Sequence, residues 1–326
     1  MSTSSSYDYS VTAANIIQAA LEDIGVIDAG GTVSSADSTL CLRRLNFIVK
    51  QLQGQADKAP GLKVWTRQRI ALFLAKGQQT YTIGPAATDS RATAQYGRTT
   101  LSAAEDAGQT VLSITSNTDT TTYPGTTVTM TASDIIGIEL DDGTLQWTTI
   151  SGTPGATATV AVALTGAAAA GRYVYWFTSR AQRFPVLEFA NLRNSDGTDT
   201  PITVYGELAD YESLPQKDAD GDPTAMLVEP LRLNTRITLD SQPTDVTNQV
   251  MLTVLYPAED YDSTADDIAF PQEWFAALEW ELAFRCAPSF GRPWTPEMQA
   301  NYVAAMGIAR DVNEANSSAY FQPGAE

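Results

Sequence analysis

The feature that most constrains the fold is the separation of helix-forming sequence at the two ends of the chain by a long β-type middle. Residues 13–24 and 42–52 carry apolar side chains at helical spacing, as do residues 275–282 and 302–312. Between residues 77 and 256, short strand-like runs alternate with Asp, Gly and Pro turns. Isolated helices of this length bury too little apolar surface to be stable. We therefore expect both ends to build one helical domain.

The predicted fold class is α+β, with a helical bundle formed by the N- and C-terminal helices and a large β-rich insertion. Apolar residues make up 43% of the chain, which is enough for hydrophobic cores in both parts. The expected domains are residues 1–69 as the N-terminal part of the helical domain, 70–256 as the β-rich insertion, 257–315 as the C-terminal part of the helical domain, and 316–326 as an extended C-terminal tail.

Capping and turn residues in the sequence predict where several helices and one hairpin begin or end. Thr12 or Ser10 can cap the first helix, and Gly25 is placed to end it. The last helix has Thr295 as its expected N-cap. In the middle, the turn sequence of residues 141–143 separates two alternating runs and predicts a β-hairpin.

The composition excludes several kinds of active site. The chain contains no histidine, so a Ser-His-Asp or Cys-His nucleophile, a His-bearing zinc site and a histidine proton shuttle are all impossible. Its two cysteines, Cys41 and Cys286, lie in apolar helical patterns, and we interpret them as small core residues. No P-loop, GxGxxG or GxSxG motif occurs. The sequence therefore predicts that the protein is not an enzyme and binds no cofactor.

Neighbouring carboxylates do not change this expectation. Glu279 and Glu281, like Asp266 and Asp267, point in different directions on a helix, and we expect them to be exposed and without a perturbed pKa. No catalytic acid/base pair is predicted from them.

One acidic cluster has the oxygen-rich spacing of a calcium loop. It consists of Asp218, Asp220, Asp222 and Glu229. Pro223 occupies the position at which that loop needs glycine for its sharp turn. The spacing is also typical of a solvated turn between strands, which we favour, and the sequence leaves cation binding open.

Charge restricts the partners. The chain has 38 acidic and 20 basic residues, a net charge of −18, and this argues against a general basic surface that grips nucleic acid. Residues 1–76 are near neutral, whereas the excess of acid lies in residues 77–256 and 257–326. No segment has the apolar length of a membrane span, and the first residues lack the pattern of a cleavable signal. We expect a protein that is made in the cytosol and has no membrane partner.

Arginine and aromatic residues mark the candidate interfaces. The adjacent arginines of the second helix form a solvated or subunit-facing edge, and tryptophans concentrate in the C-terminal helices, where core packing and an interface are equally favoured. Two further aromatics lie in the polar tail. The candidate subunit or portal-contacting residues are Arg43, Arg44, Trp274, Trp280, Trp294, Tyr320 and Phe321.

These elements together resemble a known family. The similar features are Gly25 after the first helix, Leu-Asn at 45–46 in a helix that runs into residues 62–65, the helix start at 270–274, and Gly291 before the final helix. In these features the chain resembles the head-to-tail adaptor proteins of short-tailed bacteriophages. These are also called head-completion, tail-accessory or packaged-DNA-stabilisation proteins. Residues 141–149 resemble a segment of phage tail and adaptor proteins that carry a β insertion.

The resemblance implies a structural virion protein at the head–tail junction, assembled in the host cytoplasm. It implies a dodecameric homo-oligomer that docks on the portal protein, extends the DNA channel and attaches the tail, with a C-terminal tail that reaches a neighbour or the portal. The β insertion would face the tail nozzle and the fibre or spike proteins. DNA would pass through without sequence-specific binding, repelled by acidic residues that line the channel. The alternative is a β-rich tail component that binds a host receptor or glycan.

Overall fold

The computed structural model describes residues 9–54, 67–84, 91–122, 125–217, 219–256 and 258–313. It contains both helices and strands, and the strands lie mainly in the middle of the chain, so the predicted α+β class is confirmed.

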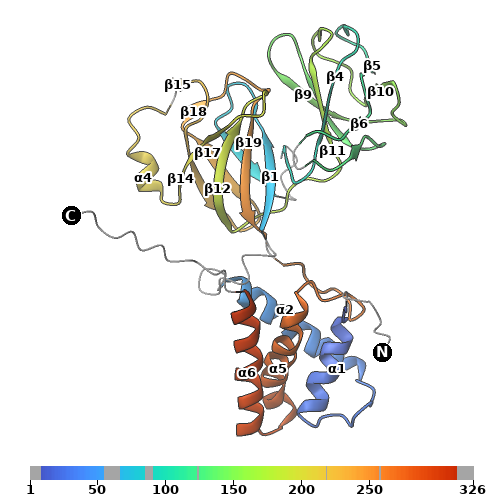
Figure 1. Ribbon diagram of the computed structural model, residues 1–326, viewed down its shortest axis with the longest axis vertical. Coiled ribbons are helices and arrows are strands. Elements are labelled where there is room, and N and C mark those ends of the chain that lie inside the picture. Colours follow the sequence, from blue (N-terminus) through green and yellow to red (C-terminus); the bar gives the residue numbers. More distant parts are fainter. Residues whose placement is uncertain are drawn as a thin grey trace, which may run out of the picture. The chain divides into compact units, whose positions relative to one another are not determined.

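The chain divides into two compact units. The first, the helical unit, combines Met1–Thr66 with Pro257–Glu326, and the second, the β unit, is Arg67–Tyr256. In Figure 1 the blue helices from the start of the chain and the red helices from its end belong to the same unit. Each unit has hydrophobic cores of its own.

Two helices of the helical unit begin at the N-caps expected from the sequence. Thr12 and Asn15 form a capping box at the start of the first helix, with the Asn15 backbone N–H donating to the Thr12 hydroxyl at 3.4 Å. The Met298 N–H donates to the Thr295 hydroxyl at 3.3 Å, so both predicted N-caps are confirmed. The elements are α1 (Ala13–Asp23), α2 (Ser35–Gly54), the 3₁₀ turn η1 (Gln272–Trp274), α5 (Phe275–Cys286), the 3₁₀ turn η2 (Ala287–Phe290) and α6 (Pro296–Asn313).

The core of the helical unit joins the two ends of the chain. Fully buried side chains of Ile17 on α1, Ile48 on α2 and Leu282 on α5 belong to one apolar cluster, to which α6 also contributes. The Asn46 side chain links α2 to the segment before α5 by two hydrogen bonds. Its amide donates to the Tyr261 carbonyl at 2.9 Å and accepts from the Tyr261 N–H at 2.9 Å. Burial of side chains from all four helices in one cluster stabilises each of them.

The described residues of the β unit form one five-stranded sheet, two four-stranded sheets and several short pairs. The five-stranded sheet has the order β13 (Asp199–Pro201), β12 (Val186–Arg193), β19 (Gln249–Leu255), β1 (Arg67–Phe73), β3 (Ala92–Thr93). A four-stranded sheet of order β14 (Thr203–Tyr205), β16 (Ala225–Pro230), β17 (Thr235–Leu239), β2 (Thr80–Ile83) shares an apolar core with it. The short helix α4 (Leu208–Glu212) follows β14.

The second four-stranded sheet has a core of its own. Its order is β4 (Gly97–Thr100), β11 (Tyr173–Phe177), β8 (Ile135–Glu139), β9 (Leu145–Thr149). The predicted hairpin at residues 141–143 is confirmed, because β8 and β9 pair antiparallel and Gly143 takes the left-handed φ of 78° that the turn requires. The short pairs are β5 (Val111–Ser113) with β10 (Thr157–Thr159), β6 (Thr118–Asp119) with β7 (Val128–Thr129), and β15 (Ala219–Asp220) with β18 (Ser241–Gln242).

An aromatic cluster joins these sheets within the β unit. The ring of Phe73 on β1 lies 5.1 Å, centroid to centroid, from each of the rings of Tyr96, Trp147 and Tyr175. Tyr175 is fully buried on β11, and Trp147 comes from β9. Aromatic pairs of this geometry add to the stabilisation from burial, so they fix the second four-stranded sheet to β1.

Both cysteines are core residues, as predicted, but they also touch. Cys41 on α2 and Cys286 on α5 are fully buried, and their Sγ atoms lie 3.6 Å apart. The contact with Cys41 lowers the pKa of the Cys286 thiol, and the Arg44 guanidinium acts in the same direction. Because the two Sγ atoms are already in contact, a small movement of the side chains would bring them to the bond length of a disulfide.

This contact predicts an intramolecular cross-link. Treating the reduced protein with diamide should join Cys41 and Cys286, because the two Sγ atoms are already in contact. Peptide mapping under non-reducing conditions would identify the linked peptides. The Cys41→Ser variant should form no disulfide, either within one chain or between two chains. Cross-links only between two chains would contradict the packing of α2 against α5.

Candidate interaction surfaces

Four aromatic side chains gather at the surface of α5 and α6. This group, the C-terminal aromatic cluster, consists of Trp280, Phe284, Trp294 and Tyr302. The Phe284 ring packs edge-on against Trp294 at 5.1 Å and is stacked on Tyr302 at 5.9 Å. Phe284 is 43% exposed, and the other three are half-buried. The cluster offers a partner a rigid apolar surface with polar edges.

The three candidate tryptophans have different positions. Trp274 is buried in the core of the helical unit, where its ring lies 6.1 Å from Phe270. Trp280 and Trp294 meet edge to face at 6.2 Å, and the Trp294 indole N–H donates to Gln299 at 2.9 Å. The structure therefore brings two of the three together on the surface and uses the third for packing.

The two candidate arginines also differ in their surroundings. Arg43 is exposed on α2, whereas the Arg44 guanidinium donates to the backbone carbonyl of Arg285 and to the Ser289 hydroxyl. Arg44 thus ties α2 to the end of α5. Beside Arg43, one helical turn further on, lies Phe47, which is 60% exposed.

Sequence reasoning missed part of these surfaces. Phe284, Tyr302 and Phe47 are exposed or half-buried aromatics that were not among the candidates. The signal for Phe47 was its position outside the apolar stripe of α2. The other two could be found only by placing α5 next to α6. The candidates Tyr320 and Phe321 lie outside the described residues.

The calcium-like cluster is partly engaged in other contacts. Asp218 lies outside the described residues. Asp222 accepts a hydrogen bond from the Asn248 amide at 3.3 Å, and Glu229 forms an ion pair with Arg236 at 2.7 Å. In the part of the chain that the structure describes, no group of three or more Cys, Asp or Glu residues is arranged to hold a metal ion.

The expectation that Glu279 and Glu281 are exposed is wrong. Both lie on α5, which is in contact with α1, α2 and α6, so that little of its surface reaches water. Glu281 is buried and accepts hydrogen bonds from the Tyr302 hydroxyl at 2.6 Å and from Arg285 at 2.7 Å. Glu279 is half-buried beside Asp23 at the end of α1.

Glu279 lies in surroundings that disfavour its charged form. Burial is the largest cause, and together with the neighbouring carboxylates of Asp23 and Glu22 it raises the pKa of Glu279 to about 7. The buried Oδ2 of Asp23 has no hydrogen-bond donor among the described residues, and protonation of the neighbouring Glu279 would offer it one.

This carboxyl pair predicts a pH dependence of the helical unit. The folded pKa of Glu279 lies above its ordinary value of 4.5, so between these values the folded state binds more protons than the unfolded state. The free energy of unfolding should therefore fall by about 1 kcal/mol as the pH rises from about 5 to about 8, after discounting for solvent screening.

Urea titrations followed by far-UV circular dichroism would measure this fall. The Glu279→Gln variant keeps a donor for Asp23 without titrating, so its curve should lack this part of the pH dependence. An identical pH dependence in the variant and the parent protein would contradict the raised pKa of Glu279.

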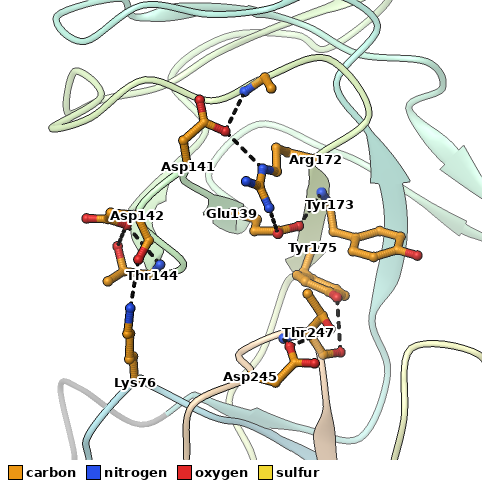
Figure 2. Close-up of polar contacts among 11 residues, drawn as sticks. Lys76, Glu139, Asp141, Asp142, Thr144, Arg172, Tyr173, Tyr175, Asp245 and Thr247 are labelled. Carbon is orange, nitrogen blue, oxygen red and sulfur yellow. Dashed lines mark hydrogen bonds and ion pairs between the residues drawn. The ribbon is translucent and has the colours of Figure 1, made fainter.

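In the β unit, an arginine and two carboxylates fix the hairpin of β8 and β9 (Figure 2). The Arg172 guanidinium donates to Glu139 at 2.5 Å and to Asp141 at 3.0 Å. The Tyr173 N–H donates to the second oxygen of Glu139 at 3.0 Å. The backbone N–H of Ala169 and then Arg172 lower the pKa of Asp141. Both carboxylates accept hydrogen bonds from the same guanidinium, which suits a structural role.

Other polar contacts in Figure 2 connect this hairpin region to the five-stranded sheet. The Lys76 ammonium, in the loop after β1, donates to the Asp142 carbonyl at 2.9 Å. The Tyr175 hydroxyl donates to the Thr247 carbonyl at 3.4 Å, just before β19. The Lys76 and Tyr175 bonds therefore help to hold the second four-stranded sheet against the five-stranded sheet.

The Arg172 network predicts unequal costs for two matched truncations. Arg172→Ala should lower the free energy of unfolding by about 2–3 kcal/mol, because it leaves the buried Glu139 carboxylate without its counter-charge. Arg236→Ala breaks the more exposed pair with Glu229 and should cost less than about 1 kcal/mol. Urea unfolding of both variants would measure the difference, and equal losses would contradict the role given to Arg172.

Comparison with known proteins gives no family for this chain. No protein-family model matches it, and no curated protein does so either. Among the helices of the described residues, none combines the length and apolar character that a membrane crossing requires.

Proposed function

We propose that this chain is a structural virion protein, a head-to-tail adaptor that forms a dodecameric ring. In this proposal the N- and C-terminal helices form a helical bundle that docks on the portal protein and extends the DNA channel. The β unit attaches the tail through nozzle, fibre or spike proteins. The protein acts at the head–tail junction, after assembly in the host cytoplasm, without catalysis or a cofactor.

The observation that carries the proposal is the C-terminal aromatic cluster on the helical unit. Trp and Tyr are enriched at the centres of protein interfaces, since each buries a large area with little loss of conformational entropy. Phe284 exposes 43% of its surface at this cluster, and Phe47 exposes 60% on α2. A ring protein needs contacts of this kind to its neighbours and to the portal.

The organisation of the chain also supports the proposal. The β unit enters through β1 and leaves through β19, which are paired along their whole length from Arg67↔Leu255 to Phe73↔Gln249. An insertion whose ends meet can project from a ring without disturbing the helices that build it. It is therefore suited to contact a different partner from the helical unit.

The charge distribution fits a channel through which DNA slides. The chain carries a net charge of −18, and the excess of acid lies in the β-rich middle and the C-terminal segment. Acidic groups that line a channel repel the phosphate backbone and so prevent tight, sequence-specific binding. Tight and salt-sensitive binding of the isolated protein to duplex DNA would contradict this part of the proposal.

Assembly on the portal is the direct test. We expect the protein, mixed with the portal protein encoded in the same genome, to give particles with twelve copies and twelvefold symmetry in cryo-electron microscopy. The Phe284→Ala variant should weaken this complex at least tenfold, because it removes the most exposed ring of the cluster. Phe189→Ala, which removes an exposed ring of the β unit instead, is the matched control and should assemble normally.

A second candidate function is a β-rich tail component that binds a host receptor or glycan. One observation favours it, a polar cavity in the β unit with two arginines in its lining. The two candidates differ in stoichiometry, because twelvefold rings on the portal support the adaptor, whereas a trimer that binds a glycan and ignores the portal supports the alternative.

A further inference from the structure

A small polar cavity opens in the β unit where several strands begin or end. Its volume is about 210 Å³, below the roughly 300–1,000 Å³ typical of pockets for drug-sized ligands, so it suits a ligand of about the size of one sugar ring. The lining comes from the start of β4, the segment after β6, the end of β12 and the start of β19. It includes Tyr96, Arg98, Thr121, Arg193, Asn194 and Gln249.

Arg98 is the group in this cavity that is best able to bind an anion. Its guanidinium lies over the Tyr173 ring, 5.1 Å from the centroid, and one N–H donates to the Ser195 carbonyl at 3.3 Å. In the described part of the chain it forms no ion pair. A guanidinium has five N–H donors, so most of them remain available to a ligand.

The charges around Arg98 leave the cavity positive. Arg98, Arg193 and Arg69 all act on the Tyr96 phenol to lower its pKa, and only Asp119 opposes them among these charges, although burial is the larger effect and raises the pKa. Arg193 is held by Asp199 through two bonds of 2.7 Å. Three arginines, Arg98, Arg193 and Arg69, are matched by two carboxylates, Asp119 and Asp199. The formal charge of +1 that remains favours a ligand with a single negative charge, such as a carboxylate, over a dianionic phosphate.

The rest of the lining is neutral and polar. The Asn194 side chain contributes an amide, and Gln249 and the Tyr96 hydroxyl are linked to each other at 3.4 Å. The Thr121 hydroxyl donates to Asp119 at 3.0 Å, which orders this edge of the cavity. Amides and hydroxyls are the partners that the hydroxyl groups of a sugar require.

We propose that this cavity binds one acidic sugar residue, with the sugar carboxylate on Arg98 and its hydroxyl groups on Asn194 and the neighbouring polar side chains. The proposal names the ligand class for the second candidate function and rests on that candidate. It is independent of the ring, so its failure would leave docking on the portal unaffected.

Ligand-observed NMR on the full chain, with D-glucuronate as the probe, is the test. We expect saturable binding that weakens as salt is added, because the contact to Arg98 is ionic. D-Glucose should bind at least tenfold more weakly, since it lacks the carboxylate. Inorganic phosphate that binds as well as glucuronate, or a lack of saturable glucuronate binding, would overturn the acidic-sugar assignment.

Three variants locate the binding site. Arg98→Gln should weaken glucuronate binding by about tenfold or more, the usual effect of losing a charge-assisted hydrogen bond. Asn194→Ala, which leaves the backbone bonds of its hairpin in place, should weaken it several-fold. Arg232→Gln removes an exposed arginine outside the cavity and should bind like the parent chain. Unchanged binding in both of the first two variants, with native circular dichroism, would overturn the proposal.

Discussion

The antiparallel pairing of β1 with β19 is the constraint on which the rest of the structure depends. Arg67 lies opposite Leu255, so the chain enters and leaves the β unit at neighbouring positions, with partner Cα atoms about 5 Å apart. Helices from both ends of the chain can therefore share one core in spite of the long insertion between them. Without this pairing, the ends of the insertion would be far apart, and the cost of closing the helical unit would rise.

Within the helical unit, α5 connects structure to the proposed function. It is in contact with α1, α2 and α6, and this burial accounts for the raised pKa of Glu279 and for the contact between Cys41 and Cys286. The part of α5 that remains accessible carries Phe284, which belongs to the C-terminal aromatic cluster. The same helix thus holds the two ends of the chain together and offers a partner an apolar surface, which is why we propose this unit for docking on a portal.

The sequence predicted the features that depend on near neighbours. The caps at Thr12 and Thr295 and the hairpin at residues 141–143 follow from local backbone chemistry, and all three are confirmed. Local chemistry could not predict three other features. These are the burial of Glu279, the hydrogen bond from Arg44 to the Arg285 carbonyl, and the cavity around Arg98. Each depends on elements that are far apart in the sequence, and periodicity within one element carries no information about which element packs against it.

The most direct test of this account replaces the β unit by a linker. Thr66 would be joined to Pro257 through about eight Gly and Ser residues. Such a linker spans roughly 15 Å, which is more than the separation of the paired strands β1 and β19 that it replaces. Far-UV circular dichroism during urea unfolding is the measurement. The account predicts a helical protein with one cooperative transition. A spectrum without helix, or unfolding without a cooperative transition, would contradict the claim that the two ends of the chain form one independent helical unit.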